Sequence, residues 1–148
     1  MNNVSFMIVV DFEKAYDSVD WKYLDFVMEK MGFIDKWRGW TSECLRTTTI
    51  SVLVNGSPTK EFEVGKGLRQ GDPLSLFLFL LAAEGFNLMM SKGVQLNLFE
   101  GYKVGTGDVN ISHLQYADDT LIVGKKSWKN VRAIKANLQL FELISGLK

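Results

Sequence analysis

Apolar residues near the start of the chain form one short, continuous run. The stretch "VSFMIVVDF" is rich in β-branched side chains and ends close to an acid, which predicts a buried strand over residues 4–11. Apolar residues then recur at helical spacing over residues 21–31, and Gly32 is well placed to end that helix. A second helix is expected over residues 35–45. The first third of the chain is therefore predicted to be a strand followed by two helices.

The middle of the chain combines a hairpin signal with a long apolar segment. "TTISVLVNGSPTKEFEV" alternates in polarity around Asn55-Gly56, the strongest short hairpin signal in the sequence. "KGLRQGDPLSLFLFLLAAEGF" begins as a glycine-containing loop and becomes an apolar helix that Asp72 can cap and Pro73 can begin. Its apolar part is shorter than the ~20 residues that a membrane span needs, and Glu84 and Asn87 interrupt it. We therefore expect a buried helix and no membrane.

The last third of the chain predicts a second hairpin and a final helix. Apolar runs at residues 111–116 and 120–123 lie so close to the acids at 118–119 that a tight hairpin is expected. The helix that follows carries on one face Val131, Ile134, Leu138 and Phe141. The order strand, helices, hairpin, helix, hairpin, helix predicts an α+β fold with helices packed on one face of an antiparallel sheet. The 148 residues suit a single domain, 1–148.

Composition narrows the class of protein. The chain is 47% hydrophobic and 23% charged, which is typical of a globular domain and argues against disorder. Seventeen basic residues balance seventeen acidic ones, and this neutral total neither requires nor excludes a nucleic-acid partner. With Cys44 as its single cysteine the chain forms no internal disulfide, and the N-terminus lacks the basic start of a signal peptide. An intracellular protein is therefore expected.

Three acids follow or end apolar runs, and together they indicate a metal site. If the second hairpin pairs with the first strand, Asp11 lies beside Asp118 and Asp119. Two unit charges ~4 Å apart repel by roughly 4 kcal/mol at an effective dielectric constant of about 20, so either protons or a divalent cation must relieve the repulsion. Carboxylates without cysteine or convergent histidine favour Mg²⁺ or Mn²⁺, which suit phosphoryl chemistry. The alternative is that Asp118 and Asp119 are ordinary turn residues and Asp11 is an exposed strand end.

Three stretches resemble, in this order, the motifs of the palm domain of reverse transcriptases: "VVDFEKAYDSVDW", "GLRQGDPLS" and "YADD". The wider wording, including "ISHLQYADDTLIVG", is most similar to non-LTR (LINE-type) retrotransposons, especially those of plants. The resemblance covers residues 4–148. It implies an RNA-directed DNA polymerase in the nucleus or cytoplasm. Such an enzyme uses two Mg²⁺ or Mn²⁺ ions to join a dNTP to the 3′-hydroxyl of a DNA primer on an RNA template.

The resemblance also implies roles for single residues. Asp11 and Asp118 match the metal ligands of the family, and the backbone carbonyl of Phe12 matches a further oxygen ligand. Asp119 matches the second acid of the hairpin tip, which is usually required although its metal contact is less direct. Tyr16 matches the aromatic gate beneath the incoming sugar, where a rigid ring leaves no room for a 2′-hydroxyl. The alternative for Tyr16 is an ordinary core or boundary residue.

A glycine-containing loop matches the family's nucleotide-binding loop. By the resemblance, Gln70 and Gly71 lie against the incoming nucleotide and the template, and the absence of a side chain at Gly71 permits close approach. Lys66 and Arg69 could contact phosphate, although solvated loop charges are an equal alternative. Tyr116 is expected near the primer terminus.

Some features depart from the family pattern or lie outside it. Leu76 stands where the family usually has proline, so altered loop geometry or a modest loss of activity is expected. His113 alternates with apolar neighbours and is expected to be structural. The fingers and thumb regions of longer family polymerases are expected to be absent. The leading hypothesis is therefore a catalytic polymerase palm, and the main alternative is a catalytically inactive retroelement remnant with at most weak metal and nucleic-acid binding. A splicing maturase shares the palm but fits "YADDTLIVG" less well.

Overall fold

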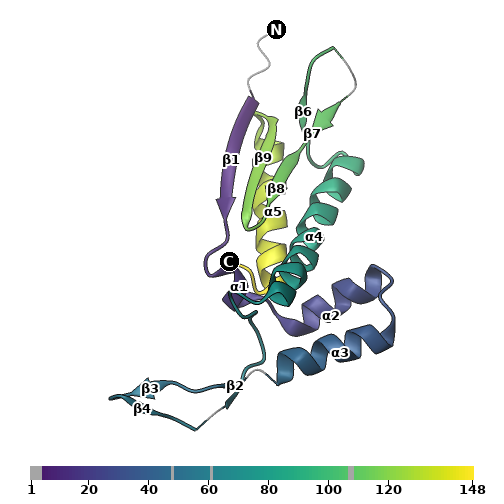
Figure 1. Cartoon of the computed structure of the whole chain (residues 1–148). Coiled ribbons are helices and arrows are strands. Elements are labelled where there is room, and N and C mark those ends of the chain that lie inside the picture. Colours follow the sequence, from purple (N-terminus) through teal and green to yellow (C-terminus); the bar gives the residue numbers. More distant parts are fainter. Residues whose placement is uncertain (1–4, 48, 61, 107–108) are drawn as a thin grey trace.

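A three-stranded antiparallel sheet forms the centre of the structure, a computed structural model that describes residues 5–47, 49–60, 62–106 and 109–148 (Figure 1). Its strands are β1 (Ser5–Asp11), β8 (His113–Tyr116) and β9 (Asp119–Lys125), with β9 in the middle. The predicted first strand and the tight second hairpin are confirmed. Val4, the expected first residue of β1, lies outside the described residues.

The two faces of this sheet have different surroundings. On one face Thr120 and Ile122 are fully buried, and this face is covered by α4 (Pro73–Gln95) and α5 (Trp128–Ser145). On the other face Met7 and Val9 point away from the core, and each exposes more than half of its surface. The predicted α+β fold, with helices packed on one face of an antiparallel sheet, is therefore confirmed.

The predicted helices of the first third are also present. After a single turn, α1 (Ala15–Ser18), the chain forms α2 (Trp21–Lys30) and α3 (Asp35–Arg46). Arg38 of α3 binds Asp25 of α2 through two parallel hydrogen bonds, Nε to Oδ1 at 2.9 Å and Nη2 to Oδ2 at 2.6 Å. Hydrogen bonding from this guanidinium lowers the pKa of the Asp25 carboxyl below its ordinary value. The two helices are thus joined by a bidentate ion pair as well as by apolar contacts.

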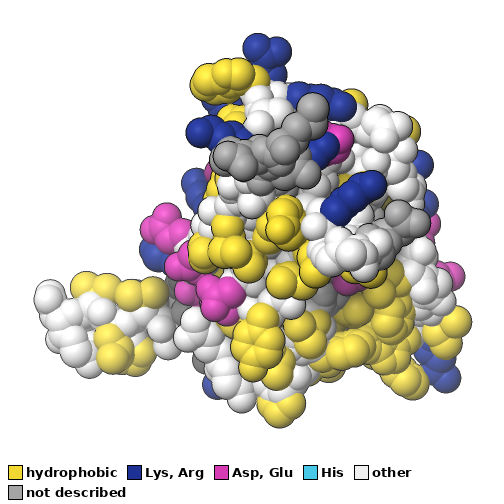
Figure 2. All heavy atoms as spheres, turned by 90° about the horizontal axis from the view of Figure 1, so that it is seen from above, with side chains coloured by type: hydrophobic (Ala, Val, Ile, Leu, Met, Phe, Trp, Pro, Cys, Tyr) yellow, Lys and Arg dark blue, Asp and Glu magenta, His cyan; other side chains and the backbone are white. Residues whose placement is uncertain are grey.

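The hairpin predicted around Asn55-Gly56 is confirmed as a ribbon that projects from the body of the protein (Figures 1 and 2). β3 (Leu53–Val54) pairs with β4 (Ser57–Pro58), and β2 (Thr49–Ile50) pairs with β5 (Phe62–Glu63) nearer the body. Both turn residues have positive φ, +50° at Asn55 and +81° at Gly56, as a two-residue hairpin turn favours. Figure 2 shows hydrophobic side chains on the surface of this projection.

A further short hairpin was not predicted. β6 (Tyr102–Lys103) pairs with β7 (Asn110–Ile111), so Ile111 belongs to a different ribbon from β8. The expectation of one continuous run over residues 111–116 was therefore wrong. The chain changes partner at Ser112, whose carbonyl accepts a hydrogen bond from the Val123 N–H at 2.9 Å.

Helix α4 is the central helix of the core. Its fully buried side chains are Leu78, Phe79, Ala82, Phe86 and Met90. In the part of the chain that the structure describes, α4 is the one helix long and apolar enough to cross a membrane by length and composition, with a mean hydropathy of 1.6. Asp72 caps it by accepting the Leu74 N–H at 2.9 Å, and Pro73 is its first residue, as predicted. The predicted helix therefore buries one face in the core, whereas Leu76, Phe77, Leu80 and Leu88 are 42–54% exposed.

A buried asparagine joins three segments at the far end of the sheet. Asn130 is fully buried, and its Oδ1 accepts the Glu100 N–H at 2.8 Å. Its Nδ2 donates to the carbonyl oxygens of Glu100 at 2.8 Å and Lys125 at 2.9 Å. This side chain therefore ties the start of α5 to the end of β9 and to the turn that precedes β6.

Replacing Asn130 with Ala should lower the free energy of unfolding by roughly 2–4 kcal/mol, because it leaves buried backbone groups without partners. Chemical denaturation at neutral pH measures the change. The matched control is Asn137→Ala, whose side chain makes only a long contact to the sulfur of Met90 at 3.5 Å, and it should cost less than about 1 kcal/mol. Equal, small losses in the two variants would contradict the role of Asn130.

Candidate functional site

The sheet ends in two acids that face each other. β1 and β9 pair from Ser5 opposite Lys125 to Asp11 opposite Asp119. Directly opposed side chains lie on the same face of a sheet, so both carboxylates lie on the face that the helices leave open, and both residues are exposed. Tyr116 pairs with Asp119 across the hairpin and is 84% exposed. The pairing of the first strand with the hairpin thus brings Asp11 to the end of the sheet that carries the acid pair, as expected.

Asp118 lies in the turn between β8 and β9, where strand alternation no longer sets the direction of a side chain. Ala117 before it has a φ of +52°, a left-handed conformation that costs a residue with a Cβ about 1–2 kcal/mol. Among the described residues, no group of three or more His, Cys, Asp or Glu side chains is placed to hold a metal ion. Strand pairing therefore brings Asp11 and Asp119 together, and Asp118 lies in the adjoining turn. The role of the three acids as one metal site stays a prediction.

Phe12 anchors the end of β1 in the core. Its side chain is 5% exposed, and its ring centroid lies 6.3 Å from that of Phe86 and 5.7 Å from that of Phe141. This packing fixes the backbone immediately after Asp11. The role of the Phe12 carbonyl as a metal ligand remains a prediction.

The segment after β1 is tied to the loop before α4. The half-buried ring of Tyr16 stacks on Phe79 of α4, with centroids 4.7 Å apart and planes at 27°. The carbonyl of Tyr16 accepts the Leu68 N–H at 2.6 Å, and the Gly67 N–H donates to the Val19 carbonyl at 2.8 Å. A Cβ at Gly67 would lie 2.8 Å from a backbone oxygen, and its φ is +92°, so this close approach requires glycine.

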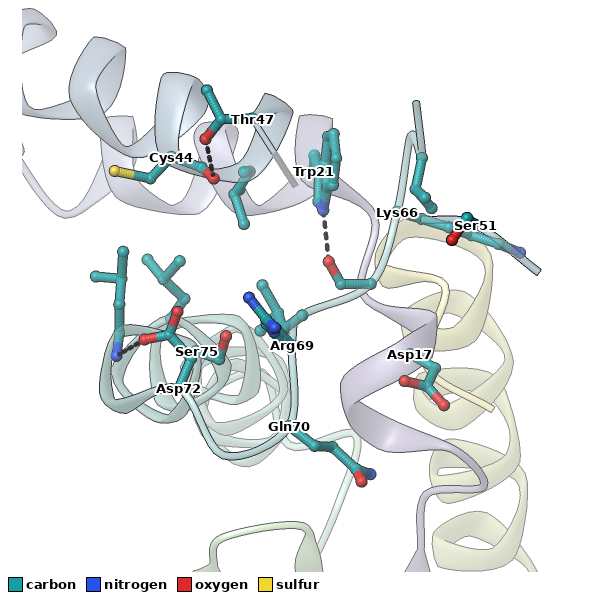
Figure 3. Close-up of a pocket in the computed structure, with 16 residues that line it drawn as sticks. Asp17, Trp21, Cys44, Thr47, Ser51, Lys66, Arg69, Gln70, Asp72 and Ser75 are labelled. Carbon is teal, nitrogen blue, oxygen red and sulfur yellow. Dashed lines mark hydrogen bonds between the residues drawn. The ribbon is translucent and has the colours of Figure 1, made fainter. Parts of the chain in front are cut away.

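A cavity of about 1090 Å³ opens beside this loop, the end of α3 and the start of α4. Figure 3 shows Arg69 among the lining residues near the middle of the view, with Trp21 above it, Gln70 below it and Asp17 to its right. Lys66 lies on its rim, so the basic side chains of the loop border the cavity. The predicted loop residue Gln70 therefore lies at a hollow large enough for a ligand group.

The candidate residues fall into two groups at the same end of the sheet (Figure 1). One group consists of the acids and Tyr116, and the other consists of Gln70 at the cavity and Gly71, the next residue of the loop. Gly71 has a φ of +85°, and a Cβ there would meet no atom within 4 Å, so its backbone conformation favours glycine while its surroundings are open. The segment that carries Tyr16 lies between β1 and the cavity loop in the chain and is hydrogen-bonded to that loop.

Leu76 continues helix α4 without interruption. Its N–H donates to the Asp72 carbonyl at 3.3 Å, a bond that proline could not make. The side chain is half-exposed. The departure from the family pattern thus regularises the first turn of the helix.

His113 belongs to a polar group whose other members the sequence did not reveal. Its Nε2 lies 2.8 Å from Asn87 Oδ1, and Asn87 Nδ2 donates to Glu84 Oε1 at 2.7 Å. Its Nδ1 lies 2.9 Å from Ser112 Oγ. Burial lowers the pKa of His113 below its ordinary value, while the Glu84 carboxylate acts in the opposite direction. These contacts agree with a structural role, and the signal for them was a pair of polar residues three apart in an apolar helix.

Comparison with known proteins gives a family match over almost the whole chain. Residues 1–146 match the family described as "Reverse transcriptase (RNA-dependent DNA polymerase)". An uncharacterized 149 kDa protein of the transposon TX1 from Xenopus laevis is 31% identical over 116 residues, which are 78% of this chain and 8% of that protein. A Pol polyprotein of the retrotransposable element R2 from Popillia japonica is 28% identical over 118 residues, or 79% of this chain and 16% of the polyprotein.

Two further likenesses have different extents. An uncharacterized mitochondrial protein of Arabidopsis thaliana is 37% identical over 68 residues, which are 46% of this chain and 56% of that protein. The structure of apo telomerase from Candida tropicalis, truncated from its C-terminal domain, superimposes with a TM-score of 0.63 at 16% identity, over 97% of this chain and 29% of that one. At this identity the likeness shows the fold alone. The family match and the retrotransposon relatives confirm the resemblance to reverse transcriptases that the sequence indicated.

Replacing Asp119 with Asn should raise the free energy of unfolding of the unliganded protein by a few tenths to about 1 kcal/mol, because like charges directly opposite one another destabilise a sheet. The gain should shrink when salt is raised to about 1 M, where the Debye length is ~3 Å. Chemical denaturation at low and high salt measures it. Glu43→Gln, which removes an exposed acid from α3, should give no comparable gain, and equal gains in the two variants would contradict the pairing.

Proposed function

The chain belongs to the reverse transcriptase (RNA-dependent DNA polymerase) family, and on this premise we propose that it is the palm of an RNA-directed DNA polymerase. It would transfer nucleotides from dNTPs to the 3′-hydroxyl of a DNA primer on an RNA template. The observation that carries the proposal is the placement of Asp11 opposite Asp119 at the end of the sheet, beside the turn that holds Asp118. The chain spans 8% of the TX1 protein and 56% of the mitochondrial protein, so the activity of a whole polymerase is part of the proposal.

The acids at the end of the sheet fit divalent cations by their chemistry. Carboxylate oxygens are the hard ligands that Mg²⁺ and Mn²⁺ prefer. Mg²⁺ usually takes one or two protein carboxylates and completes its coordination with water and substrate phosphates. The exposed pair Asp11 and Asp119, with Asp118 alongside, therefore suits two ions without a closed protein cage. When bound, such ions supply charge stabilisation to the attacking and leaving oxygens of nucleotidyl transfer.

The residues around the acids would hold and orient rather than react. In the proposal Asp11, Asp118 and the Phe12 carbonyl bind the cations, and Asp119 is the second acid of the tip. Because the carboxylates repel one another, cation binding is favoured by the relief of that repulsion. Tyr116, exposed beside Asp119, would contact the primer terminus.

The segment after β1 and the loop before α4 would select the nucleotide. Stacking on Phe79 restricts the ring of Tyr16, and a restricted ring can exclude a 2′-hydroxyl by its bulk. Gln70 and Gly71 would lie against the nucleotide and template, where the open space around Gly71 allows a close approach. Arg69 lines the neighbouring cavity and offers a guanidinium to a phosphate group.

One observation favours a second candidate function, an inactive retroelement remnant with at most weak metal and nucleic-acid binding. Among the described residues the acids do not form a three-membered metal-binding group. The chain also has no net positive charge with which to attract nucleic acid. The two hypotheses differ in whether nucleotide transfer occurs when the palm is placed inside a working polymerase.

Saturating Mn²⁺ should raise the melting temperature of the wild-type chain, because a ligand that binds the folded state stabilises it by about 2.7 kcal/mol at 100 times its dissociation constant. Asp11→Asn and Asp118→Asn should each reduce the shift, which thermal denaturation with and without Mn²⁺ measures. Glu43→Gln, on a helix that Figure 1 places away from the sheet, should keep the full shift. Equal shifts in all four proteins would mean that the ions bind elsewhere.

The decisive test of the polymerase hypothesis is a graft. Residues 1–148 replace the palm of an active retroelement reverse transcriptase, and primer extension is measured on an RNA template with Mg²⁺. Extension should be detectable, and Asp118→Ala should abolish it, since positioning of the reactants and the ions can supply ~7–11 kcal/mol of the barrier. Glu43→Gln in the same graft should extend normally. A folded but inactive graft would favour the remnant.

A further inference from the structure

Two buried polar atoms lie on the side of the sheet opposite to the carboxylates, with no hydrogen-bond partner among the described residues. They are Nε2 of Gln115 and Oγ1 of Thr120. Gln115 and Thr120 lie directly opposite each other in the pairing of β8 with β9, so both side chains leave the sheet on the same face. Thr120 is fully buried and follows Asp119 directly. The two unpaired atoms thus belong to directly opposed residues behind the acid turn, by which we mean residues 117–119.

Leaving both atoms unpaired would carry the desolvation penalty of a hydroxyl and of an amide, and native proteins rarely accept it. Opposed residues of an antiparallel pair have Cβ atoms about 4.5–5.5 Å apart. Because the structure shows no direct hydrogen bond between them, that separation suits a bridge through one buried water molecule. Their chemistry is complementary, since an amide N–H donates and a hydroxyl oxygen accepts.

The strand that carries Gln115 is also held to helix α4. Asn87 must turn its Nδ2 toward the Glu84 carboxylate, so its Oδ1 faces His113. The hydrogen of the imidazole is therefore on Nε2, and Nδ1 accepts from the Ser112 hydroxyl. Both ring nitrogens are engaged, which fixes β8 on α4.

Close packing does not support the acid turn from this side. A cavity of about 380 Å³ lies between α4 and β8, reaches Ala117 in the turn, and is bordered by Glu84, Asn87, His113 and Gln115. Ala117 is in addition the residue with the unfavourable positive φ. A strained turn next to a hollow depends on hydrogen bonds to keep its position.

We propose that Thr120 and Gln115 are positioning residues, joined by hydrogen bonds through one buried water molecule, and that this bridging bond holds the acid turn so that Asp119 stays opposite Asp11. The contact of His113 with Asn87 fixes the same strand on α4, the helix that begins directly after the Gln70 loop. One helix thus supports both groups of candidate residues. The role of this bond in cation binding rests on the proposed function, whereas the bond itself does not.

The bond is tested by a double-mutant cycle of Thr120→Val and Gln115→Met, which remove the polar groups and approximately keep the shapes. If the atoms are joined, each single variant is less stable than wild type. The double variant then loses less stability than the two single losses added together, and the difference corresponds to a factor of about five in the unfolding equilibrium constant. Thr120→Ser keeps the hydroxyl and should retain the coupling. Additive effects, or a Thr120→Val variant that is more stable than wild type, would overturn the bond.

The positioning role is tested by Mn²⁺ affinity, measured by calorimetric titration. Thr120→Val should weaken binding by about tenfold or more, as the loss of groups that orient metal ligands does, and Thr120→Ser should restore it. The matched control is Thr41→Val on α3, another buried threonine, whose hydroxyl donates to the Trp37 carbonyl, and it should leave the affinity unchanged. If wild type binds Mn²⁺ through Asp11 and Thr120→Val binds it equally well, the positioning role is wrong.

A readout without metal separates this inference from the proposed function. Thr120→Val should move the backbone amide resonances of residues 117–119 in NMR spectra, and Thr120→Ser should leave them close to wild type. If the wild-type protein shows no Mn²⁺ binding that depends on Asp11, the proposed function is contradicted. The positioning role is then judged from the amide resonances of residues 117–119 alone. Resonances of the acid turn that stay in place in Thr120→Val would overturn it.

Discussion

The antiparallel register of β1 on β9 is the constraint on which the candidate site depends. A slip of one residue would turn the side chains of a strand to its other face and end the opposition of Asp11 and Asp119. The register is fixed by packing far from the acids: Ile122 is fully buried, and a Cβ at Gly124 would lie 2.7 Å from the ring of Phe99. Only glycine fits there, so the part of β9 remote from the acids can take one position on the core. The opposition of the two acids at one end of the sheet therefore depends on side-chain packing elsewhere in the sheet.

Helix α4 performs the equivalent task for the rest of the site. Its buried residue Phe79 supports the ring of Tyr16, its cap Asp72 ends the loop that carries Gln70, and its polar residue Asn87 holds β8. A purely apolar helix of this length could slide or rotate in its groove, because apolar contacts are not directional. The hydrogen bonds give it a defined rotation. The polar groups in this helix therefore help to set the position of the two groups of candidate residues relative to each other.

Much of this arrangement could be predicted from the sequence, and the remainder has a common reason for escaping prediction. The spacing of apolar residues, the helix-capping residues and the turn residues indicated β1, α4 and both predicted hairpins, because each of these signals lies within a short stretch of sequence. The contact of His113 with Asn87 joins residues 26 apart. Glu84 and Asn87 stand out as polar residues in an apolar helix, but no local signal identifies His113 as their partner. Likewise, spacing could bring Asp11 near the acid pair but could not choose between Asp118 and Asp119, because that choice depends on one step of register. The roles proposed for Tyr16 and Gln70 came from the family motifs. A net charge of zero could not by itself indicate a nucleic-acid partner.

Exposure of Asp11 and Asp119 reconciles a stable fold with two carboxylates placed directly opposite each other. None of the ion pairs formed by the described residues involves Asp11, Asp118 or Asp119, so no basic side chain of residues 5–47, 49–60, 62–106 or 109–148 forms a salt bridge with them. In water, two charges ~4 Å apart repel by only about 1 kcal/mol, whereas the same pair at an effective dielectric constant of about 20 repels by about 4 kcal/mol. The unliganded protein therefore tolerates the pair as long as solvent reaches it. Under the proposed function, a nucleotide that covers the pair would remove this solvent, strengthen the repulsion, and so raise the affinity for a divalent cation that arrives with its phosphates. Because binding linkage is reciprocal, the proposal requires that nucleotide and cation each strengthen the binding of the other.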